Sequence, residues 1–262
     1  SEVLLIPGFE ADPYRGLSPH PEIAEIRAVG LWRLIQGYRG FVVTTLSSFV
    51  TRLPAAERFL DQCIDLEVGR PFSLDELIAK LRQLGYVRED PVAGIGEYSK
   101  RGGIVDVYSP AHENPVRVEF FGDDIESIRE FNPATQRSVT LLHTAHVIPI
   151  REFSVSAQEI TDWHEKAPLH WKEVPYAEDL QEKLQFTGNG ELFNGFEYLF
   201  PLVVDCRDSL LDYVGTQPKR FELIAPQPEE FFRALDELEE KWFDRFEDSC
   251  REGELALEPS RL

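Results

Sequence analysis

Residues 100–108 read KRGGIVDVY, and residues 115–129 read PVRVEFFGDDIESIR. In the second run, apolar residues alternate with charged or aromatic ones: Val116, Val118 and Phe120 against Arg117, Glu119 and Phe121. Because successive side chains of a strand point to opposite faces, the first set belongs on a core and the second set faces outward. Turn-forming residues separate three such runs, at 103–108, 115–121 and 125–131, which predicts an antiparallel meander.

An amphipathic helix is expected before the meander. Ser73 stands in the N-cap position with Glu76 three residues later, as in a capping box, and Gly85 follows the last apolar position. The apolar stripe between them consists of Leu77, Ile78, Leu81 and Leu84. A half-buried strand at 64–68 precedes the helix. Together these elements predict a small α+β domain at 63–148, whose antiparallel sheet packs against the one helix.

The segments on both sides of this domain predict an α/β lobe. Buried strands are expected at 3–6 and 41–43, around a helix with Ser18 as its N-cap and Pro19 in its first turn. The lobe therefore comprises 1–62 and 149–262. In its second part we expect helices at 158–166, 178–185 and 229–248, and strands at 202–205 and 221–225. The last helix carries an apolar stripe typical of a packed face: Phe231, Leu235, Leu238, Trp242 and Phe246.

The chain is acidic. Its 262 residues include 47 Asp and Glu against 27 Lys and Arg, a formal net charge of -20. Such a charge repels phosphates, so this chain is not expected to bind nucleic acid or an anionic membrane by itself. No apolar run reaches the roughly 18–20 residues of a membrane span. Cys63, Cys206 and Cys250 have no metal or disulfide spacing, which indicates a cytoplasmic location. The lack of methionine indicates a fragment of a longer protein.

Signatures of catalysis and of cofactor binding are missing from the sequence. A phosphate-binding loop ends in Gly-Lys-Ser/Thr, and the chain has no Gly-Lys pair. The run Gly94-Ile95-Gly96 lacks the third glycine of a dinucleotide loop and indicates a turn before a strand. The six histidines have no metal-ligand spacing, and no serine or cysteine has the context of a nucleophile. We therefore expect a non-catalytic module with no cofactor and no metal.

The outward-facing residues of the meander carry the clearest functional signal. Arg117 and Phe121 lie on one strand and Arg101 on its neighbour, and arginine beside an exposed aromatic is typical of a protein-binding hot spot. In the alternative interpretation, a neighbouring segment buries Phe121 and the charged residues pair across the strands. Composition leaves both interpretations open.

These residues also resemble a known family. The runs RGGIVDVYSP (101–110) and PVRVEFFGDDIESIREFNPATQRS (115–138) look like the signature of the UvrB-related module of bacterial transcription-repair coupling factors. The runs LSPHPEIAEIR (17–27) and GFEYLFPL (195–202) are similar to that family as well. The resemblance implies an α/β fold in which a degenerate helicase-like (P-loop-type) lobe is interrupted by a small α+β domain that binds UvrA.

The resemblance also implies site residues and a function. It assigns the UvrA contact to Arg101, Arg117 and Phe121, and Glu119 falls at a position implicated in UvrB. The implied function is a non-catalytic adaptor that recruits UvrA to lesions where transcription has stalled, for nucleotide excision repair. RNA polymerase, DNA, ATP and Mg²⁺ would be bound by other parts of the parent protein, an ATP-dependent DNA translocase.

Two other functions stay open. A UvrB-type excision-repair ATPase carries a phosphate loop and a Tyr-rich hairpin that clamps DNA. Here the segment GFEADPYRGLSPHPE (8–22) has one tyrosine and leaves no room for that hairpin. The other function is that of a degenerate lobe that still binds a nucleotide, which titration with ATP and Mg²⁺ would detect.

Overall fold

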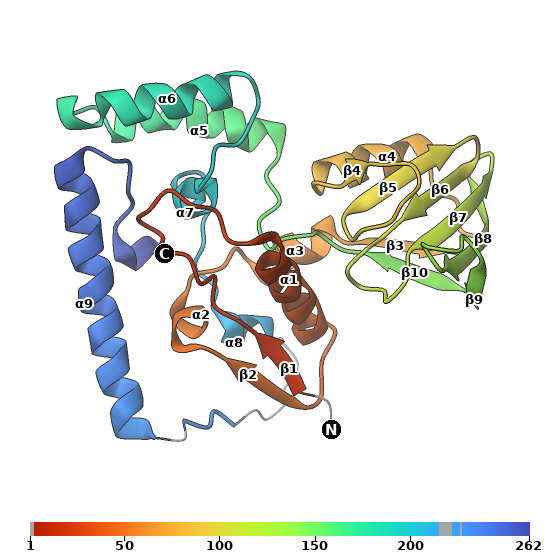
Figure 1. Cartoon of the computed structure of the whole chain (residues 1–262), viewed down its shortest axis with the longest axis horizontal. Coiled ribbons are helices and arrows are strands. Elements are labelled where there is room, and N and C mark those ends of the chain that lie inside the picture. The colour runs from red at the N-terminus through yellow and green to blue at the C-terminus, as the bar shows by residue number, and fades with distance from the viewer. Residues whose placement is uncertain (1–2, 215–221, 226) are drawn as a thin grey trace. The chain divides into compact units, whose positions relative to one another are not determined.

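A six-stranded sheet dominates residues 57–154, which form one of two compact units. The computed structural model describes residues 3–214, 222–225 and 227–262 (Figure 1). The strands of this sheet follow the order β4 (Val87–Arg88), β5 (Glu97–Arg101), β6 (Ile104–Val107), β7 (Val116–Phe121), β8 (Asp124–Phe131) and β9 (Ser138–Leu142). β4 and β5 are parallel, and every other neighbouring pair is antiparallel.

The predicted meander corresponds to β6, β7 and β8, which are paired antiparallel as expected. The sequence analysis did not predict β4, β5 or β9. The side chains of β9 are largely exposed on both faces, so its sequence has no alternation that could reveal a strand. The predicted inserted domain, 63–148, lies within the unit 57–154, and its boundaries stay a prediction.

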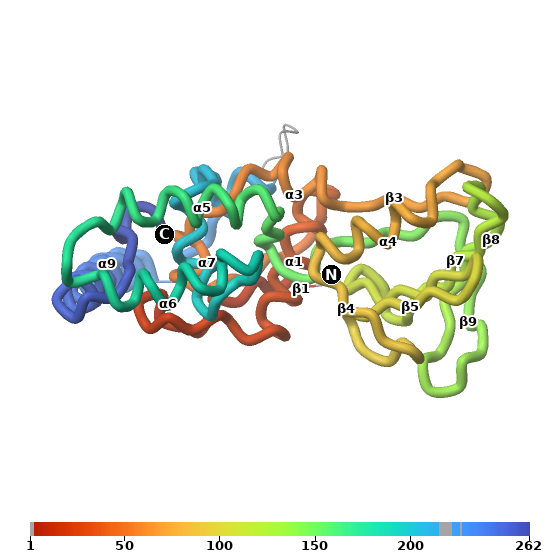
Figure 2. Tube along the Cα trace, turned by 90° about the horizontal axis from the view of Figure 1, so that it is seen from above, coloured from red at the N-terminus to blue at the C-terminus, as the bar shows by residue number. Residues whose placement is uncertain are grey.

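One helix and a second small sheet complete the core of this unit. Helix α4 (Leu74–Gln83) packs its apolar stripe on the six-stranded sheet. Figures 1 and 2 both show this helix lying against the strands. Strands β3 (Ile64–Glu67) and β10 (Thr144–Val147) pair antiparallel and add their buried side chains to the same core. Ser73 caps α4 by accepting from the Glu76 amide at 3.4 Å, as predicted. Glu76 itself pairs with Lys80 at 3.1 Å.

The second unit comprises residues 1–56 and 155–262. Its strands β1 (Val3–Ile6) and β2 (Phe41–Thr44) pair in parallel around helix α1 (Pro21–Ile35), which is the predicted βαβ order. The architecture of the chain is therefore mixed α/β with antiparallel sheets. That this unit is a helicase-like lobe stays a prediction.

The predicted start of α1 is wrong by two residues. The helix begins at Pro21, and His20 is its N-cap, whose Nδ1 accepts from the Glu22 amide at 3.4 Å. A residue before proline is kept out of the helical region, so His20 cannot continue a helix begun at Pro19. Ser18 instead accepts from the backbone of Gly195 at 2.9 Å.

The predicted burial of the parallel strands is also wrong in part. Phe41, Val42 and Val43 of β2 are all exposed, whereas Leu4 and Ile6 of β1 are buried. Apolar runs become buried parallel strands when helices cover both faces of the sheet. Among the described residues, α1 packs on β1 and leaves the side chains of β2 open to solvent.

The remaining helices belong mostly to the second part of this unit. They are α2 (Leu46–Val50), α3 (Ala56–Gln62), α5 (Ala157–His170), α6 (Ala177–Gly188), α7 (Phe196–Leu199), α8 (Leu210–Tyr213) and α9 (Pro228–Glu252), with single 3₁₀ turns at Val174–Tyr176, Phe200–Leu202 and Pro259–Arg261. The three helices predicted here correspond to α5, α6 and α9. Trp163 of α5 is fully buried, with ring centroids of Phe193 and Phe196 at 5.0 and 5.7 Å.

Two predicted strands are not formed. In the segment predicted at 202–205, Leu202 is the last residue of a 3₁₀ turn, and the residues after it form neither helix nor strand. Of the segment predicted at 221–225, residue 221 lies outside the described residues, and 222–225 form no strand. The stripe on α9 does pack as predicted, since Phe231 contacts Phe49 and Phe246 contacts Tyr14, with ring centroids 6.4 and 6.1 Å apart.

Candidate partner-binding surface

The face of the six-stranded sheet opposite α4 holds every predicted site residue. Strand pairing brings Asp106, Arg117, Arg129 and Leu141 into one row across β6, β7, β8 and β9. Arg101, Glu119 and Ser127 lie in the neighbouring row, since paired residues share a face. We call these seven residues, together with Phe121, the outer face.

The predicted facing of β7 is correct. Val116, Val118 and Phe120 are buried in the core under α4, and the Phe120 side chain is 9% exposed. Phe121, at the end of the same strand, is 78% exposed. The Phe121 ring is therefore accessible to a partner, on the side of β7 that the alternation of the strand predicts.

A tight turn between β5 and β6 helps to bring the outer-face residues together. Gly102 and Gly103 connect β5 to β6, and Gly102 has a φ of +62°, which favours glycine. Gly103 is required for a different reason. A Cβ atom there would lie 2.8 Å from the carbonyl oxygen of Phe120 on β7, whose amide donates to the Gly103 carbonyl at 2.8 Å. The Arg-Gly-Gly run therefore ends β5 at Arg101, and β6 lies between Arg101 and the strand that carries Arg117. The prediction that Arg101 lies on the strand next to Arg117 is wrong, because Gly102 and Gly103 turn the chain before β6 begins.

Asp106 joins the two arginines. Its side chain is 1% exposed. Nε and Nη2 of Arg117 donate to its two carboxylate oxygens at 2.6 and 2.7 Å, and Nη2 of Arg101 donates to the second oxygen at 3.0 Å. Hydrogen bonding to Asp106 raises the pKa of Arg117 above its ordinary value. Both guanidinium groups are therefore anchored to one buried carboxylate.

Further contacts fix the plane of the Arg117 guanidinium. Its central carbon lies 4.5 Å from the centroid of the buried Phe131 ring, a cation–π contact. Nη2 also donates to the side-chain oxygen of Gln136 at 3.2 Å. Carboxylate, amide and ring thus hold this arginine in one orientation.

Glu119 belongs to a second charged group on the outer face. It accepts from the Ser127 hydroxyl at 2.7 Å and pairs with Arg129. The hydrogen bond from Ser127 and the nearby Arg129 hold the pKa of Glu119 below its usual range. Glu119 is therefore ionised at neutral pH, with its charge matched by a neighbour on the next strand.

The structure bears on the alternative interpretation of this face, which is correct in part, whereas the role of the face in protein binding stays a prediction. The charged residues do pair across the strands, as the alternative interpretation requires. Phe121, however, is not buried by any neighbouring segment. The result is an ordered set of charged groups with an exposed aromatic ring at the end of β7.

Sequence reasoning missed four outer-face residues: Asp106, Ser127, Arg129 and Leu141. Asp106 lies between buried valines in the sequence, and only the strand register shows that it faces Arg117. Leu141 on the edge strand β9 is 78% exposed and occupies the same row. No local pattern points to Leu141, because β9 itself has no alternating signal.

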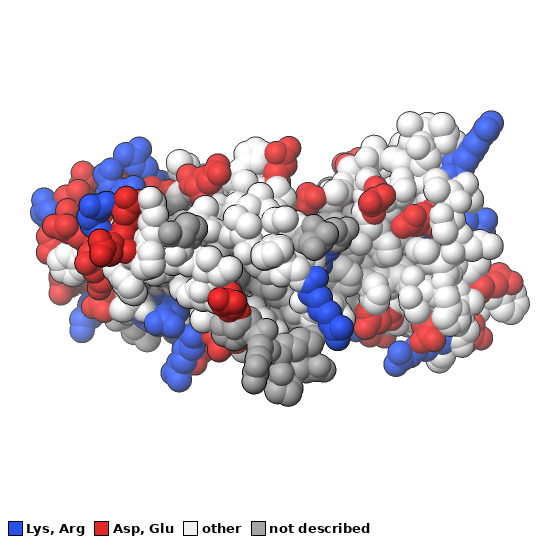
Figure 3. All heavy atoms as spheres, turned by 90° about the horizontal axis from the view of Figure 1, so that it is seen from below, with Lys and Arg blue, Asp and Glu red and all other residues white. Residues whose placement is uncertain are grey.

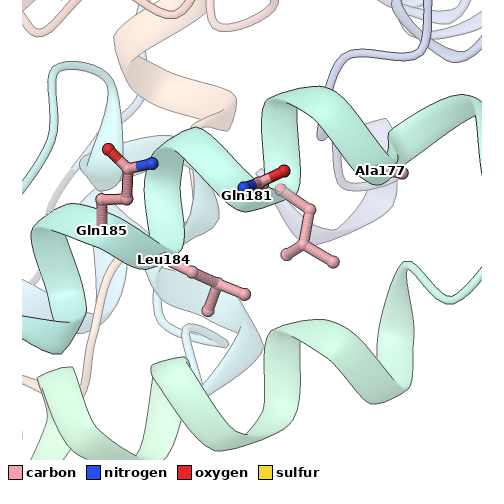
Figure 4. A pocket seen from close by; sticks show the side chains of 5 residues that line it. Ala177, Gln181, Leu184 and Gln185 are labelled. Carbon is pink, nitrogen blue, oxygen red and sulfur yellow. The ribbon is translucent and has the colours of Figure 1, made fainter.

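The rest of the described structure contains no second site with evident binding or catalytic chemistry. A shallow pocket on α6 is lined by neutral residues, which leave it without an acid, base or nucleophile (Figure 4): Ala177, Leu180, Gln181, Leu184 and Gln185. Across the described ranges, no three His, Cys, Asp or Glu side chains are grouped to hold a metal ion, and none of the helices is long and apolar enough to cross a membrane. On the face drawn in Figure 3, the described Lys and Arg residues are scattered among acidic and neutral ones and form no continuous basic band.

The comparisons with known proteins concern the same part of the chain. Residues 64–153 match the UvrB interaction domain family. This confirms the family resemblance of the central runs. The segment matched to the UvrB interaction domain contains α4 and all strands from β3 to β10, and therefore the whole outer face.

Similar curated proteins are transcription-repair-coupling factors. The chain is 28% identical to the one from Haemophilus influenzae over 216 residues, which are 82% of this chain and 19% of that protein. It is 34% identical over 157 residues to the one from Bacillus subtilis, covering 60% of this chain and 13% of the relative. For Myxococcus xanthus the identity is 39% over 153 residues, 57% of this chain and 13% of the relative. The chain thus spans a fifth or less of the length of these relatives.

Proposed function

We propose that this chain is a non-catalytic docking module of a transcription-repair coupling factor, and that its outer face binds UvrA. In this function it recruits UvrA to stalled-transcription lesions for nucleotide excision repair in the cytoplasm. The observation that carries the proposal is the position of Arg101, Arg117 and Phe121. All three lie on one solvent-facing surface inside the segment matched to the UvrB interaction domain.

The chemistry of the surface supports a protein partner. Exposed aromatic rings and arginines dominate the binding energy of protein interfaces, and here both occur on a rigid sheet. The net charge of -20 argues against nucleic acid as the direct partner of this chain. RNA polymerase and DNA are partners that we assign to other parts of the parent protein, together with ATP and Mg²⁺.

We also propose that the unit formed by 1–56 and 155–262 is a degenerate helicase-like lobe. Its β1–α1–β2 unit has the parallel order of such lobes, and the sequence contains no Gly-Lys pair to hold a triphosphate. The competing functions are a UvrB-type ATPase and a lobe that still binds nucleotide. Both require the chain to take up ATP, whereas the docking function does not.

Calorimetric titration separates these functions. Purified UvrA is titrated into the folded chain, and we expect saturable binding at micromolar concentrations or below. ATP with Mg²⁺ is titrated in a parallel experiment, and we expect neither heat of binding nor turnover. A folded chain that shows no binding of UvrA would contradict the docking function. Binding or hydrolysis of ATP would favour the enzymatic alternatives.

A further inference from the structure

Asp106 is an unusual residue for the inside of a sheet. Its carboxylate is almost completely buried, and burying a charge costs free energy unless partners compensate for it. The partners here are Arg101 and Arg117, both of which lie on the proposed binding surface and retain exposed atoms. The buried acid therefore contacts the candidate interface from beneath.

We propose that Asp106 is a positioning residue that holds Arg101 and Arg117 in the orientation that binds UvrA. This inference rests on the proposed function, because it concerns how the same surface works. Asp106 would not touch the partner. It would act by fixing the two guanidinium groups before the partner arrives.

The geometry of the hydrogen bonds supports this role. Arg117 uses its Nε and Nη2 edge for Asp106, and within the described chain Nη1 has no bonded acceptor. Nη2 of Arg101 donates to the same carboxylate, and it also lies 3.7 Å from Oδ1 of Asp90. The side-on pairing directs the remaining N–H groups of Arg117 away from Asp106, since the guanidinium is planar and rigid.

Fixing the arginines in advance has an energetic consequence. A long side chain that becomes ordered only on binding loses rotamer freedom, which weakens the complex. Arg101 and Arg117 are already ordered by Asp106, so this loss is reduced. The group on UvrA that suits Nη1 of Arg117 is a hydrogen-bond acceptor, and an acidic side chain would form the stronger, charge-assisted bond there.

The test substitutes Asp106→Asn, which keeps the size of the side chain and removes its charge. UvrA binding should weaken by about tenfold or more, because the arginines lose their shared anchor. The matched control is Asp75→Asn. Asp75 pairs with Lys100 at 2.8 Å in the same unit, but it lies on α4 and outside the outer face. That substitution removes the same charge and should leave UvrA binding unchanged.

A double-mutant cycle shows whether Asp106 acts through the arginines. Asp106→Asn is combined with Arg101→Ala, and the fold-loss of the double variant is compared with the product of the two single losses. An indirect role predicts a smaller loss than this product. If the fold-loss of the double variant equals the product of the two single losses, Asp106 and Arg101 contribute independently. That result would overturn the proposal.

A spectroscopic signal follows the arginines without UvrA. In the intact chain, the Nε–H resonance of Arg117 should exchange slowly with solvent, because Nε donates to Asp106 at 2.6 Å. In Asp106→Asn this resonance should exchange faster while the backbone amide spectrum keeps its native dispersion. A resonance that exchanges freely in the intact chain would contradict the anchoring on which the proposal depends.

Arg117→Lys keeps the test decisive if Asp106→Asn does not fold. Lysine retains the charge opposite Asp106 but cannot reproduce the planar fork. We expect its UvrA binding to fall nearly as far as that of Arg117→Ala, whereas binding equal to the intact chain would overturn the inference. If the intact chain itself does not bind UvrA, the proposed function fails. If it binds and Asp106→Asn binds equally well, only the role of Asp106 fails.

Discussion

Phe120 and Phe121 are adjacent phenylalanines with opposite environments, and they form a matched pair for separating binding from stability. Phe121 is 78% exposed, so Phe121→Ala removes no core contact and should change the free energy of unfolding by at most about 0.5 kcal/mol. If its ring is a central anchor for UvrA, the same substitution should cost at least about 2 kcal/mol of binding, roughly thirtyfold in affinity.

Phe120→Ala is the counterpart in the core. The ring packs in the cluster under α4, and truncating a buried phenylalanine costs about 3–5 kcal/mol of stability. For a unit of this size, 1 kcal/mol shifts the melting temperature by roughly 4–8 °C, so the midpoint should fall by about 10 °C or more. UvrA binding, measured well below that midpoint, should be much less affected than in Phe121→Ala.

The assay measures thermal unfolding by circular dichroism and UvrA affinity by calorimetry for the intact chain and both variants. The reasoning predicts that one variant loses affinity and the other loses stability. If Phe121→Ala melts early while Phe120→Ala does not, the assigned facing of β7 is wrong. If Phe121→Ala keeps full affinity, the exposed ring is not part of the UvrA contact.

Two further predictions concern stability. Gly103→Ala should destabilise the chain by about 1–3 kcal/mol in a urea titration, because the new Cβ would lie 2.8 Å from the carbonyl oxygen of Phe120; an unchanged midpoint would refute this close approach. Burial lowers the pKa of His112 below its ordinary value of 6.5, so the unfolded chain binds a proton that the folded chain does not. The free energy of unfolding should therefore be independent of His112 protonation above about pH 6.5. Below that pH it should decrease, by at most about 1.4 kcal/mol per pH unit from this residue. His112→Gln should lose that part of the slope, and identical slopes in the two chains would contradict the assignment.

Local sequence patterns were sufficient for several features of the fold and of the site. The alternation in β7 gave the burial of Val118 and the exposure of Phe121, because side chains change face at every residue of a strand. Ser73 and Gly85 marked the ends of α4 through backbone requirements that depend on a few neighbouring residues. The central runs also carried the family resemblance to the UvrB interaction domain.

Features that depend on partners distant in the sequence could not be obtained this way. The apolar run at Phe41–Val43 predicts burial, yet the exposure of β2 depends on which elements cover the sheet. Leu141 acquired its place on the outer face only when β9 paired with β8.

The sequence by itself determined which residues of β7 face outward, and with them the candidates Arg117, Glu119 and Phe121. Only the tertiary structure decided that Asp106 lies beneath Arg117 and also reaches Arg101. The physical reason is that facing follows from the geometry of a single strand, whereas this contact requires the pairing register of β5, β6 and β7. Register is set by turns and core packing across the whole sheet, so the charge that orders the two arginines became visible only in three dimensions.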